Sequence, residues 1–315
     1  MKKIIKIEEI TETNDYVIYQ DTDSAFASAV PLIEKRYPTI DKSNTAEMVK
    51  ATLEITSDVQ KYINGMLDML SNRMFNVSKH KFYIKQEMVA ESAIWLAKKR
   101  YCQWIVNEGG NNCSKMMVTG IDPVRSSFPP KYSTFMKEIM EMMLKSKPQS
   151  EIDAKILKFE SELKDVDLFD AAKSTSVKFV SGKGDRNYNP KSRKPFEIIG
   201  GSPAQVKAAL SYNDLLIKFG LDKIVEPIYS GQKIRYVYLK DNEYGLDCIA
   251  LKSDGTDPKD ILDFVNTYVD RRGMYDKELK GKFTTKKKDK AGLYDVLKWT
   301  YPTLESKIAE KFFEF

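Results

Sequence analysis

Hydrophobic and polar positions near the start of the chain follow the pattern of a β-hairpin. Two β-branched or aromatic runs, YVIYQ at 16–20 and SAFASAV at 24–30, flank the polar residues Asp21, Thr22 and Asp23. Short apolar runs separated by a tight polar turn are typical of paired antiparallel strands. The sequence therefore predicts a hairpin with two aspartates at its tip.

A helical period replaces this pattern after Asn44. Asn44 and Glu47 have the spacing of a capping box, which begins a helix. The core-facing positions that follow are three, four or seven residues apart: Val49, Leu53, Thr56, Ile63, Leu67, Leu70 and Met74. This periodicity predicts one long amphipathic helix with its apolar face on a core.

Strand patterns then return. KFYIKQEMV at 81–89 alternates, and AIWLAKKRYCQWIV at 93–106 reads as a second strand with a basic cluster inside it. EGGNN at 108–112 is the expected turn before a return strand at 115–121. Sheet and a long helix within residues 1–121 predict an α+β domain with an antiparallel sheet.

The rest of the chain is predicted to be mainly helical. Prolines and serines in DPVRSSFPPKY at 122–132 mark a boundary, so we expect domains at 1–121 and 122–315. The expected elements are helices at 134–145 and 150–164 (capped by Ser150 and Asp153), helices opening at Ser202-Pro203 (ended by Gly220) and Asp257-Pro258, strands at 234–239 and 246–251, and a basic loop at 182–195.

Composition narrows the function classes. A chain of 315 residues with 42% hydrophobic residues can bury a core, and a net charge of +6 permits a nucleic-acid partner. Charges interrupt the apolar residues of the first segment, and no apolar run approaches the roughly 18 residues of a membrane span. We therefore expect no signal peptide and no membrane partner.

Few residues are suited to nucleophilic or thiolate chemistry. Cys102, Cys113 and Cys248 lie far apart and read as reduced thiols of a cytoplasmic protein. The one histidine, His80, lies in the basic stretch SKHKF and is interpreted as an exposed loop or strand residue. A His-rich zinc site is excluded, so any catalysis would have to use carboxylate and lysine side chains.

The aspartate pair has two interpretations. Asp21 could close a turn on its own backbone, which is a purely structural role. Alternatively, Asp21 and Asp23 could bind Mg²⁺, which prefers few protein carboxylates and completes its shell with water and substrate phosphate. Two such ions about 3.5–4 Å apart catalyse phosphoryl transfer by electrostatics. Glu87, in another expected strand, could add a third carboxylate.

The cluster Lys98, Lys99, Arg100 and Tyr101 also has two interpretations. It could be a charged sheet edge that discourages aggregation. Because it lies between the apolar runs AIWLA and CQWIV, it could instead contact nucleic-acid phosphates, with the tyrosine steadying a base or sugar.

In this order, YQDTDS, WLAKKRY and VTGIDPVRSS resemble the C-terminal part of the family B replicative DNA polymerases of large tailed phages. DTDS is similar to motif C of that family and KKRY to its KKxY primer-template motif. The resemblance continues through PAQVKAALSYNDLL and LDCIALKSDGT to VDRRGMYDKEL. It implies a partial palm domain at 1–121 and a thumb domain at 122–315.

The resemblance also implies roles for individual residues. Asp23 would be the principal ligand of two Mg²⁺ ions, with Asp21 in support and Glu87 as an outer carboxylate. The KKRY residues would hold primer-template DNA. Further expected phosphate contacts in the thumb are Lys183, Arg186, Lys191, Arg193 and Lys194. The tail residues Phe312, Phe313 and Phe315 are expected either to dock on a sliding clamp or to pack on the thumb.

Two polymerase motifs of that family, DxxSLYPS and KxxxNxxYG, do not occur in this sequence. The isolated chain is therefore predicted not to polymerise deoxynucleoside triphosphates. Met1 and the intact motifs favour a natural C-terminal subunit, completed by a partner chain that carries the exonuclease, the fingers and the rest of the palm. An excised fragment and an inactive relic are the alternatives. If phage-encoded, the chain would act in the host cytoplasm.

Two rival functions remain open. A DNA-binding accessory or processivity protein would use the KKRY cluster and the tail without metal chemistry. A DxD glycosyltransferase would require a nucleotide-binding domain before the aspartates, where only about twenty residues precede them.

Overall fold

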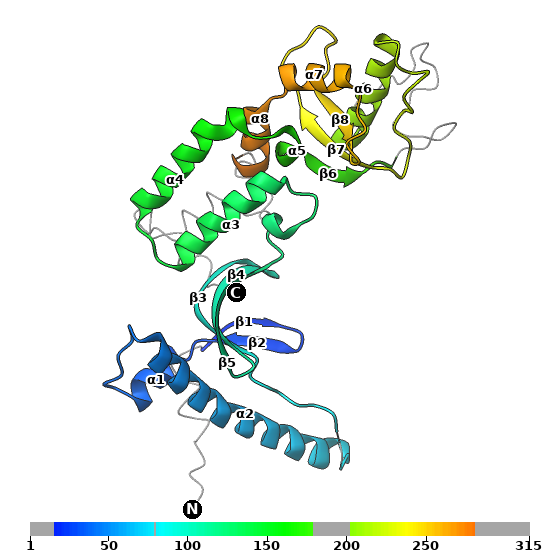
Figure 1. Cartoon of the computed structure of the whole chain (residues 1–315). Coiled ribbons are helices and arrows are strands. Elements are labelled where there is room, and N and C mark those ends of the chain that lie inside the picture. Colours follow the sequence, from blue (N-terminus) through cyan, green and yellow to red (C-terminus); the bar gives the residue numbers. More distant parts are fainter. Residues whose placement is uncertain (1–15, 79, 179–201, 281–315) are drawn as a thin grey trace, which may run out of the picture. The chain divides into compact units, whose positions relative to one another are not determined.

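The computed structural model describes residues 16–78, 80–178 and 202–280, which form two compact units (Figure 1). The first unit comprises Met1–Ile94 with Cys102–Met117, and the second comprises Trp95–Tyr101 with Val118–Phe315. Helices and antiparallel strands occur in both, which confirms the α+β class. The palm and thumb assignments and their boundary at 121/122 stay predictions.

The predicted hairpin at the start of the first unit is confirmed. Strand β1 (Val17–Asp21) pairs antiparallel with β2 (Ser24–Ala27), and Asp21 lies opposite Ser24. The second strand is shorter than expected, because helix α1 (Val30–Arg36) already begins at Val30. Pro31 lies in the first turn of α1, where its fixed φ favours a helix.

Helix α2 (Thr45–Phe75) is the long helix that the sequence predicts. The Asn44 side chain accepts hydrogen bonds from the amides of Ala46 and Glu47, as expected of a capping residue. At the other end Asn76 adopts a left-handed φ of 51°, and the Val77 amide bonds to the Ser71 carbonyl. Both ends of the helix are therefore fixed by local hydrogen bonds.

Only the first half of α2 packs on a core within this unit. Ala51 and Ile55 of α2 form a buried cluster with Ile33 of α1. Further along, the predicted core positions Leu70 and Met74 are 41% and 71% exposed. The prediction that the apolar face lies on a core is thus wrong at the end of the helix, whereas the predicted positions Ile63 and Leu67 are half-buried.

The strand predicted at 81–89 is absent over most of its length. Strand β3 begins only at Met88, and the described residues 80–87 have no regular secondary structure. We name residues 80–86 the strap, because they are held to α2 by side chains. His80 is partly buried rather than exposed, with its Nε2 2.8 Å from Asp68 Oδ1.

The strap contacts replace the ladder that a strand would need. Asn64 Nδ2 donates to the Ile84 carbonyl at 2.9 Å, and Asn64 Oδ1 accepts from the Ile84 amide at 2.8 Å. The flanking contacts are Gln60 Oε1 with the Gln86 amide (2.8 Å) and Asp68 with His80. Residues 60, 64 and 68 share one helix face, since they are four apart. Long-range partners of this kind satisfy the backbone without a neighbouring strand.

The strand predicted at 93–106 is in fact two strands. Strands β3 (Met88–Ala97), β4 (Arg100–Glu108) and β5 (Asn111–Thr119) form a sheet in the order β3-β4-β5, and Lys98 and Lys99 are the turn between the first two. Lys99 has a φ of 60°, which no regular strand accommodates. The expected turn at 108–112 is confirmed, with Gly109 and Gly110 at positive φ.

Gly120 fixes the position of the Lys98–Lys99 turn. Its φ is +64°, and a Cβ added to it would lie 1.9 Å from the carbonyl oxygen of Lys99. The Arg100 side chain, which is buried, donates from Nε to the Gly120 carbonyl at 3.3 Å. Any larger residue at 120 would therefore push the turn away.

The second unit contains helices and a small antiparallel sheet. The predicted helices at 134–145 and 150–164 are confirmed, although the expected caps Ser150 and Asp153 are wrong: Pro148 is the capping position. Helix α6 (Ala204–Lys218) follows Pro203 and ends before Gly220 as predicted. Strands β7 (Lys233–Tyr238) and β8 (Cys248–Lys252) are the expected pair, whereas β6 (Lys173–Ser176) was not predicted. The elements are η2 (Asp122–Val124), α3 (Pro130–Leu144), α4 (Gln149–Glu162), η3 (Leu163–Asp165), α5 (Leu168–Ala171), β6 (Lys173–Ser176), α6 (Ala204–Lys218), β7 (Lys233–Tyr238), β8 (Cys248–Lys252), α7 (Lys259–Tyr268), α8 (Arg271–Tyr275) and η4 (Asp276–Lys280).

Aromatic packing joins α3, α4 and α8 in this unit. Phe135 and Phe159 stack with ring centroids 3.9 Å apart, and Tyr132 meets Tyr275 edge to face. The Tyr132 hydroxyl donates to the Arg271 carbonyl at 3.2 Å, and burial raises the pKa of this phenol. Such pairs add about 0.5–1.5 kcal/mol each beyond the area that they bury.

Replacing each of two glycines with alanine is expected to change the free energy of unfolding in opposite directions. Gly65→Ala in α2 is expected to raise the free energy of unfolding by about 0.5–1 kcal/mol, because a helical glycine has excess freedom to lose and nothing lies within 4 Å of the new Cβ. Gly120→Ala is expected to lower it by about 1–3 kcal/mol, because the Cβ would collide with the Lys99 carbonyl. Urea unfolding of both variants measures the difference, and equal effects would contradict the close approach at Gly120.

Candidate active site

The DTDS sequence forms a strained turn at the tip of the β1–β2 hairpin. The Asp23 amide donates to the Asp21 carbonyl at 2.7 Å, and the Ser24 hydroxyl donates to the same carbonyl at 3.2 Å. Thr22, between the aspartates, has a φ of 54°, an unfavourable value for a β-branched residue. Strained backbone of this kind is concentrated at functional sites, so the turn is a candidate site on geometry as well as on sequence.

The two carboxylates of this turn differ in exposure. Asp21 is partly buried at the end of β1, and its Oδ1 accepts a hydrogen bond from the Thr22 hydroxyl at 3.3 Å. Asp23 is exposed in the turn itself. Since the Asp21 carbonyl closes the turn, the turn does not require a carboxylate at this position. The Asp21 carbonyl thus accounts for the closure of the turn, and the Asp23 carboxylate is exposed beside it.

Glu87 does not belong to the turn that carries Asp21 and Asp23. It is exposed and directly precedes β3, and its carbonyl accepts from the Gly109 amide at 2.7 Å. Among the described residues, no group of three or more His, Cys, Asp or Glu side chains is placed to hold a metal ion. The structure thus brings Asp21 and Asp23 together on one turn but does not join Glu87 to them in such a group. The predicted metal roles of all three stay predictions.

The KKRY cluster is divided between a turn and a strand. Lys98 and Lys99 are exposed at the β3–β4 turn and not inside a continuous strand as the sequence predicts. Arg100 begins β4 and is buried. The Tyr101 ring lies against Trp95, with ring centroids 4.7 Å apart. Of the four residues, the two lysines are therefore the best placed to meet an external phosphate.

The two predicted motifs share one backbone feature that the sequence did not reveal. In the described part of the chain, four residues other than glycine have positive φ: Thr22, Asn76, Lys99 and Ser146. Asn76 and Ser146 lie just past the ends of α2 and α3, where left-handed residues are common. Thr22 and Lys99 instead lie in the DTDS and KKRY turns. No sequence signal marked them, since neither residue type favours this conformation.

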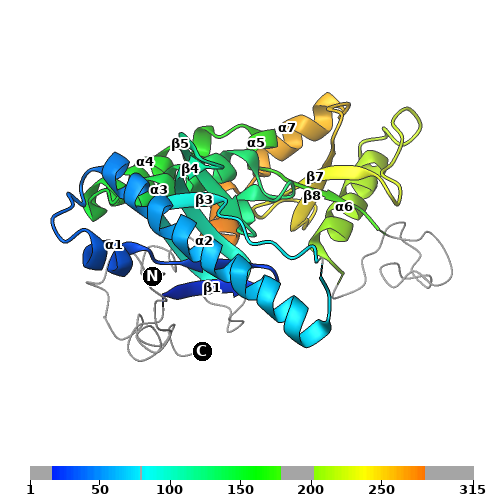
Figure 2. The same cartoon turned by 90° about the horizontal axis from the view of Figure 1, so that it is seen from below.

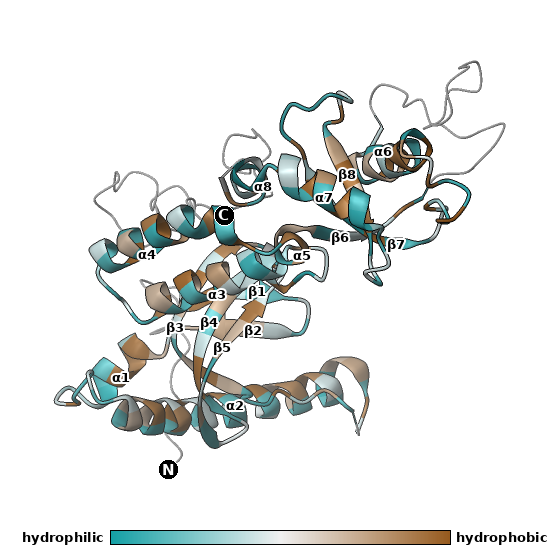
Figure 3. Cartoon of the chain, turned by 45° about the horizontal axis from the view of Figure 1, so that its top comes forward, coloured by the Kyte–Doolittle hydropathy of each residue, from teal (hydrophilic) through white to brown (hydrophobic). Residues whose placement is uncertain are grey.

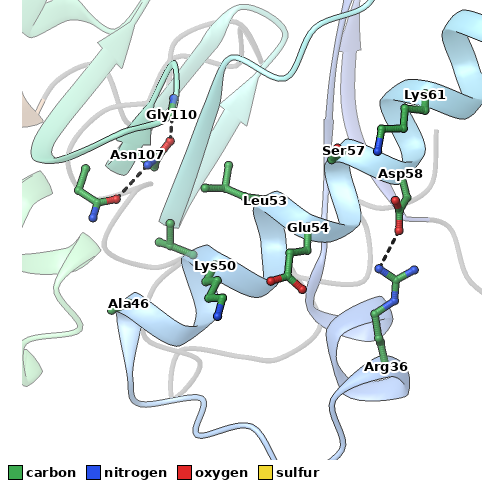
Figure 4. A pocket seen from close by; sticks show the side chains of 12 residues that line it. Arg36, Ala46, Lys50, Leu53, Glu54, Ser57, Asp58, Lys61, Asn107 and Gly110 are labelled. Carbon is green, nitrogen blue, oxygen red and sulfur yellow. Dashed lines mark hydrogen bonds and ion pairs between the residues drawn. The ribbon is translucent and has the colours of Figure 1, made fainter.

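A groove in the first unit is lined by none of the predicted site residues (Figure 4). It has a volume of about 680 Å³ and is lined by α1, α2 and the β4–β5 turn. Arg36 and Asp58 form an ion pair of 2.9 Å inside it, and Asn107 accepts from the Gly110 amide at 3.2 Å. Its lining carries charges of both signs, and no sequence pattern pointed to this groove.

Thiol chemistry is disfavoured by the surroundings of the cysteines. Cys102, Cys113 and Cys248 are free. Burial raises the pKa of the Cys102 thiol to about 12 and that of Cys248 to about 11. Both thiols therefore stay protonated near neutral pH, and a protonated thiol is a poor nucleophile.

Several predicted residues lie outside the described part of the chain. These are the basic-loop residues Lys183, Arg186, Lys191, Arg193 and Lys194 and the tail residues Phe312, Phe313 and Phe315. Across the described ranges 16–78, 80–178 and 202–280, no helix is both long enough and apolar enough to cross a bilayer.

Comparisons with known proteins agree on one class of enzyme. No protein-family model matches the chain. It is 23% identical over 286 residues to the DNA-directed DNA polymerase of Enterobacteria phage T4, covering 85% of this chain and 29% of that polymerase. It is 25% identical over 312 residues to the DNA-directed DNA polymerase of Escherichia phage RB69, covering 91% of this chain and 32% of that polymerase.

The chain therefore spans about a third of the length of the curated relatives that it matches. The similarity extends over nearly all of this chain, which is consistent with the C-terminal part of a phage DNA polymerase that the motifs indicate.

Proposed function

We propose that this chain is the C-terminal portion of a DNA-directed DNA polymerase and that the DTDS turn carries carboxylates of its nucleotidyl-transfer site. One observation carries the proposal. Two aspartates lie on a strained turn that does not need their side chains, in a chain similar over most of its length to two phage DNA polymerases. Primer-template DNA and deoxynucleoside triphosphates would be its substrates.

The donor set of the turn fits Mg²⁺. Carboxylate oxygens are hard ligands, and Mg²⁺ sites that act on phosphates use one or two carboxylates with water and substrate oxygens. Asp23 is exposed at the tip and could reach a cation, while Asp21 is held by the strand behind it. Bound Mg²⁺ would supply electrostatic stabilisation of the phosphoryl oxygens. Glu87 is proposed as a more distant carboxylate of the same site.

The Lys98–Lys99 turn is proposed as a contact with the primer-template backbone. Ammonium groups on a short, rigid turn attract phosphates regardless of sequence, which suits an enzyme that copies any template. Gly120 and the buried Arg100 keep the turn in place, and Tyr101 is supported by Trp95.

The remaining polymerase functions are proposed to come from a partner chain. About two thirds of each relative has no counterpart in this sequence. The partner would bring the second metal-binding aspartate and the fingers, and the isolated chain would be inactive. A sliding clamp is proposed as a further partner of the tail at Phe312, Phe313 and Phe315.

Asp23→Asn is expected to abolish DNA synthesis while DNA binding stays within about twofold. The amide keeps the shape of the side chain but loses the charge that holds a cation. Since the loss of an outer-shell partner already costs 10–100-fold at metal sites, the loss of a ligand should cost at least about a hundredfold. Primer extension with Mg²⁺ measures this, using tagged chain recovered from its native cells with whatever binds it.

A matched control for this experiment is Asp153→Asn, which changes an exposed carboxylate on α4. It should extend primers like the unmodified chain. Undiminished synthesis by Asp23→Asn would refute the proposed metal role. Retained DNA binding in preparations that never synthesise DNA would instead favour the accessory-protein function.

Lys98→Ala combined with Lys99→Asn is expected to weaken primer-template binding. Asparagine is chosen at 99 because it tolerates positive φ, so the turn should be kept while the charge is lost. The slope of log affinity against log salt should fall by about 2, since each lost phosphate contact contributes about 0.9. Fluorescence anisotropy over a salt series measures it.

The control carries the same change in net charge at exposed lysines outside the motif, Lys35→Ala with Lys137→Ala. An equal change of slope in both double variants would mean that the KKRY turn makes no specific phosphate contact.

A further inference from the structure

One face of α2 is covered at its start and bare at its end. Residues at spacings of three and four run along this face: Met48, Ala51, Ile55, Val59, Tyr62, Met66 and Met69. Residues at these spacings share one side of a helix. We name the last four the α2 stripe. Figure 3 shows hydrophobic positions recurring along α2 as far as its C-terminal end.

Helix α1 accounts for the covered part. Ala51 and Ile55 are buried with Ile33 of α1, and Met48 packs against the same cluster. Figure 2 shows α1 beside the first half of α2 only. Beyond Ile55 the cover ends, and the stripe residues Val59, Tyr62, Met66 and Met69 are 43%, 43%, 39% and 39% exposed. The stripe runs from Val59 to Met69, ten steps along the helix or about 15 Å at 1.5 Å per residue.

The bare half of α2 is nevertheless well ordered by local contacts. The strap is fixed to another side of the same half through Gln60, Asn64 and Asp68. Ser71 is buried, and the helix end is closed by the left-handed Asn76. The helix is thus held by local contacts, and the described residues of its unit leave this apolar side partly exposed. Such preorganisation lowers the entropy cost of binding a partner.

The chemistry of the stripe fits another protein surface. Amphipathic helices normally bury an apolar side of this width, and seams at three-four spacing accept a second helix. Tyrosine and methionine are enriched in protein interfaces. Leu70 and Met74, which are also exposed, widen the surface near the helix end.

We infer that the α2 stripe docks the complementary portion of the polymerase, through an apolar helix face of that portion. This inference rests on the proposed function. The length of the relatives indicates the occupant. They are about three times as long as the part that this chain matches, so in the proposed assembly a large portion of the polymerase must contact this chain. An uncovered apolar face on a rigid helix is suited to that role.

Photo-crosslinking in cells that naturally produce the chain tests the occupant. Benzoylphenylalanine in place of Tyr62 should form a crosslink to a polypeptide whose peptides match the part of a phage polymerase that this chain lacks. The same probe in place of Ser57, which is exposed on the opposite side of α2, should form at least about tenfold less. Crosslinks to residues 1–15, to a second copy, to residues 118–280, to an unrelated protein or to nothing would overturn the inference.

Met66→Glu tests the same surface by association. A carboxylate buried in an apolar interface is strongly unfavourable, so co-recovery of the complementary portion should fall at least about tenfold. Met66→Leu should recover it like the unmodified chain, and circular dichroism of both variants checks that α2 persists. Undiminished recovery with Met66→Glu would overturn the inference.

The outcome is separable from that of the proposed function. Loss of synthesis in Asp23→Asn together with normal recovery in Met66→Glu would leave the polymerase proposal standing and remove only the docking surface. If recovery depends on Met66 but synthesis does not depend on Asp23, the docking surface stands and the proposed metal role of Asp23 is removed.

Discussion

The candidate site depends on left-handed backbone at two turns. Thr22 and Lys99 both hold positive φ without the freedom of a glycine, and each lies in a two-residue turn that displays charged side chains. Conformations of this kind cost about 1–3 kcal/mol each and persist only where the surroundings enforce them. For Lys99 the enforcing contact is Gly120, whose missing Cβ lets two backbone segments meet.

Much of the fold followed from local sequence. The hairpin at Asp21–Asp23, the Asn44 cap of α2 and the turn at Gly109–Gly110 each depend on residues within a few positions, and all were predicted. These features are decided by side-chain hydrogen bonds and by allowed φ angles, which a sequence states directly.

Apart from the cap of α4, which is Pro148 rather than Ser150, the main wrong predictions involve contacts between distant residues. The strap alternates like a strand, yet its partners are Asn64 and its neighbours about twenty positions earlier. The KKRY turn reads as strand because lysine does not signal positive φ, and the cause lies at Gly120. The second half of α2 has the periodicity of a buried helix, but periodicity shows only that a face is apolar and not whether this chain covers it.

Together these features fit a chain that packs against further protein, as the proposed function requires. Its carboxylates lie on a two-stranded hairpin, its basic turn is rigid, and an ordered helix leaves its apolar side bare. Two-stranded hairpins are marginal by themselves, and bare apolar stripes are normally buried. Both become reasonable if more protein packs against this chain, as the proposed polymerase assembly requires.

On the proposed function, the Asp21–Asp23 turn holds the catalytic cations. Iron-mediated cleavage tests it directly, with Fe²⁺ in place of Mg²⁺ in the recovered assembly with primer-template and nucleotide. Hydroxyl radicals cut the backbone close to the bound ion, so the account predicts Mg²⁺-suppressible cuts within a few residues of Asp23 that disappear in Asp23→Asn. Cuts confined to other regions of an assembly that still synthesises DNA would contradict it.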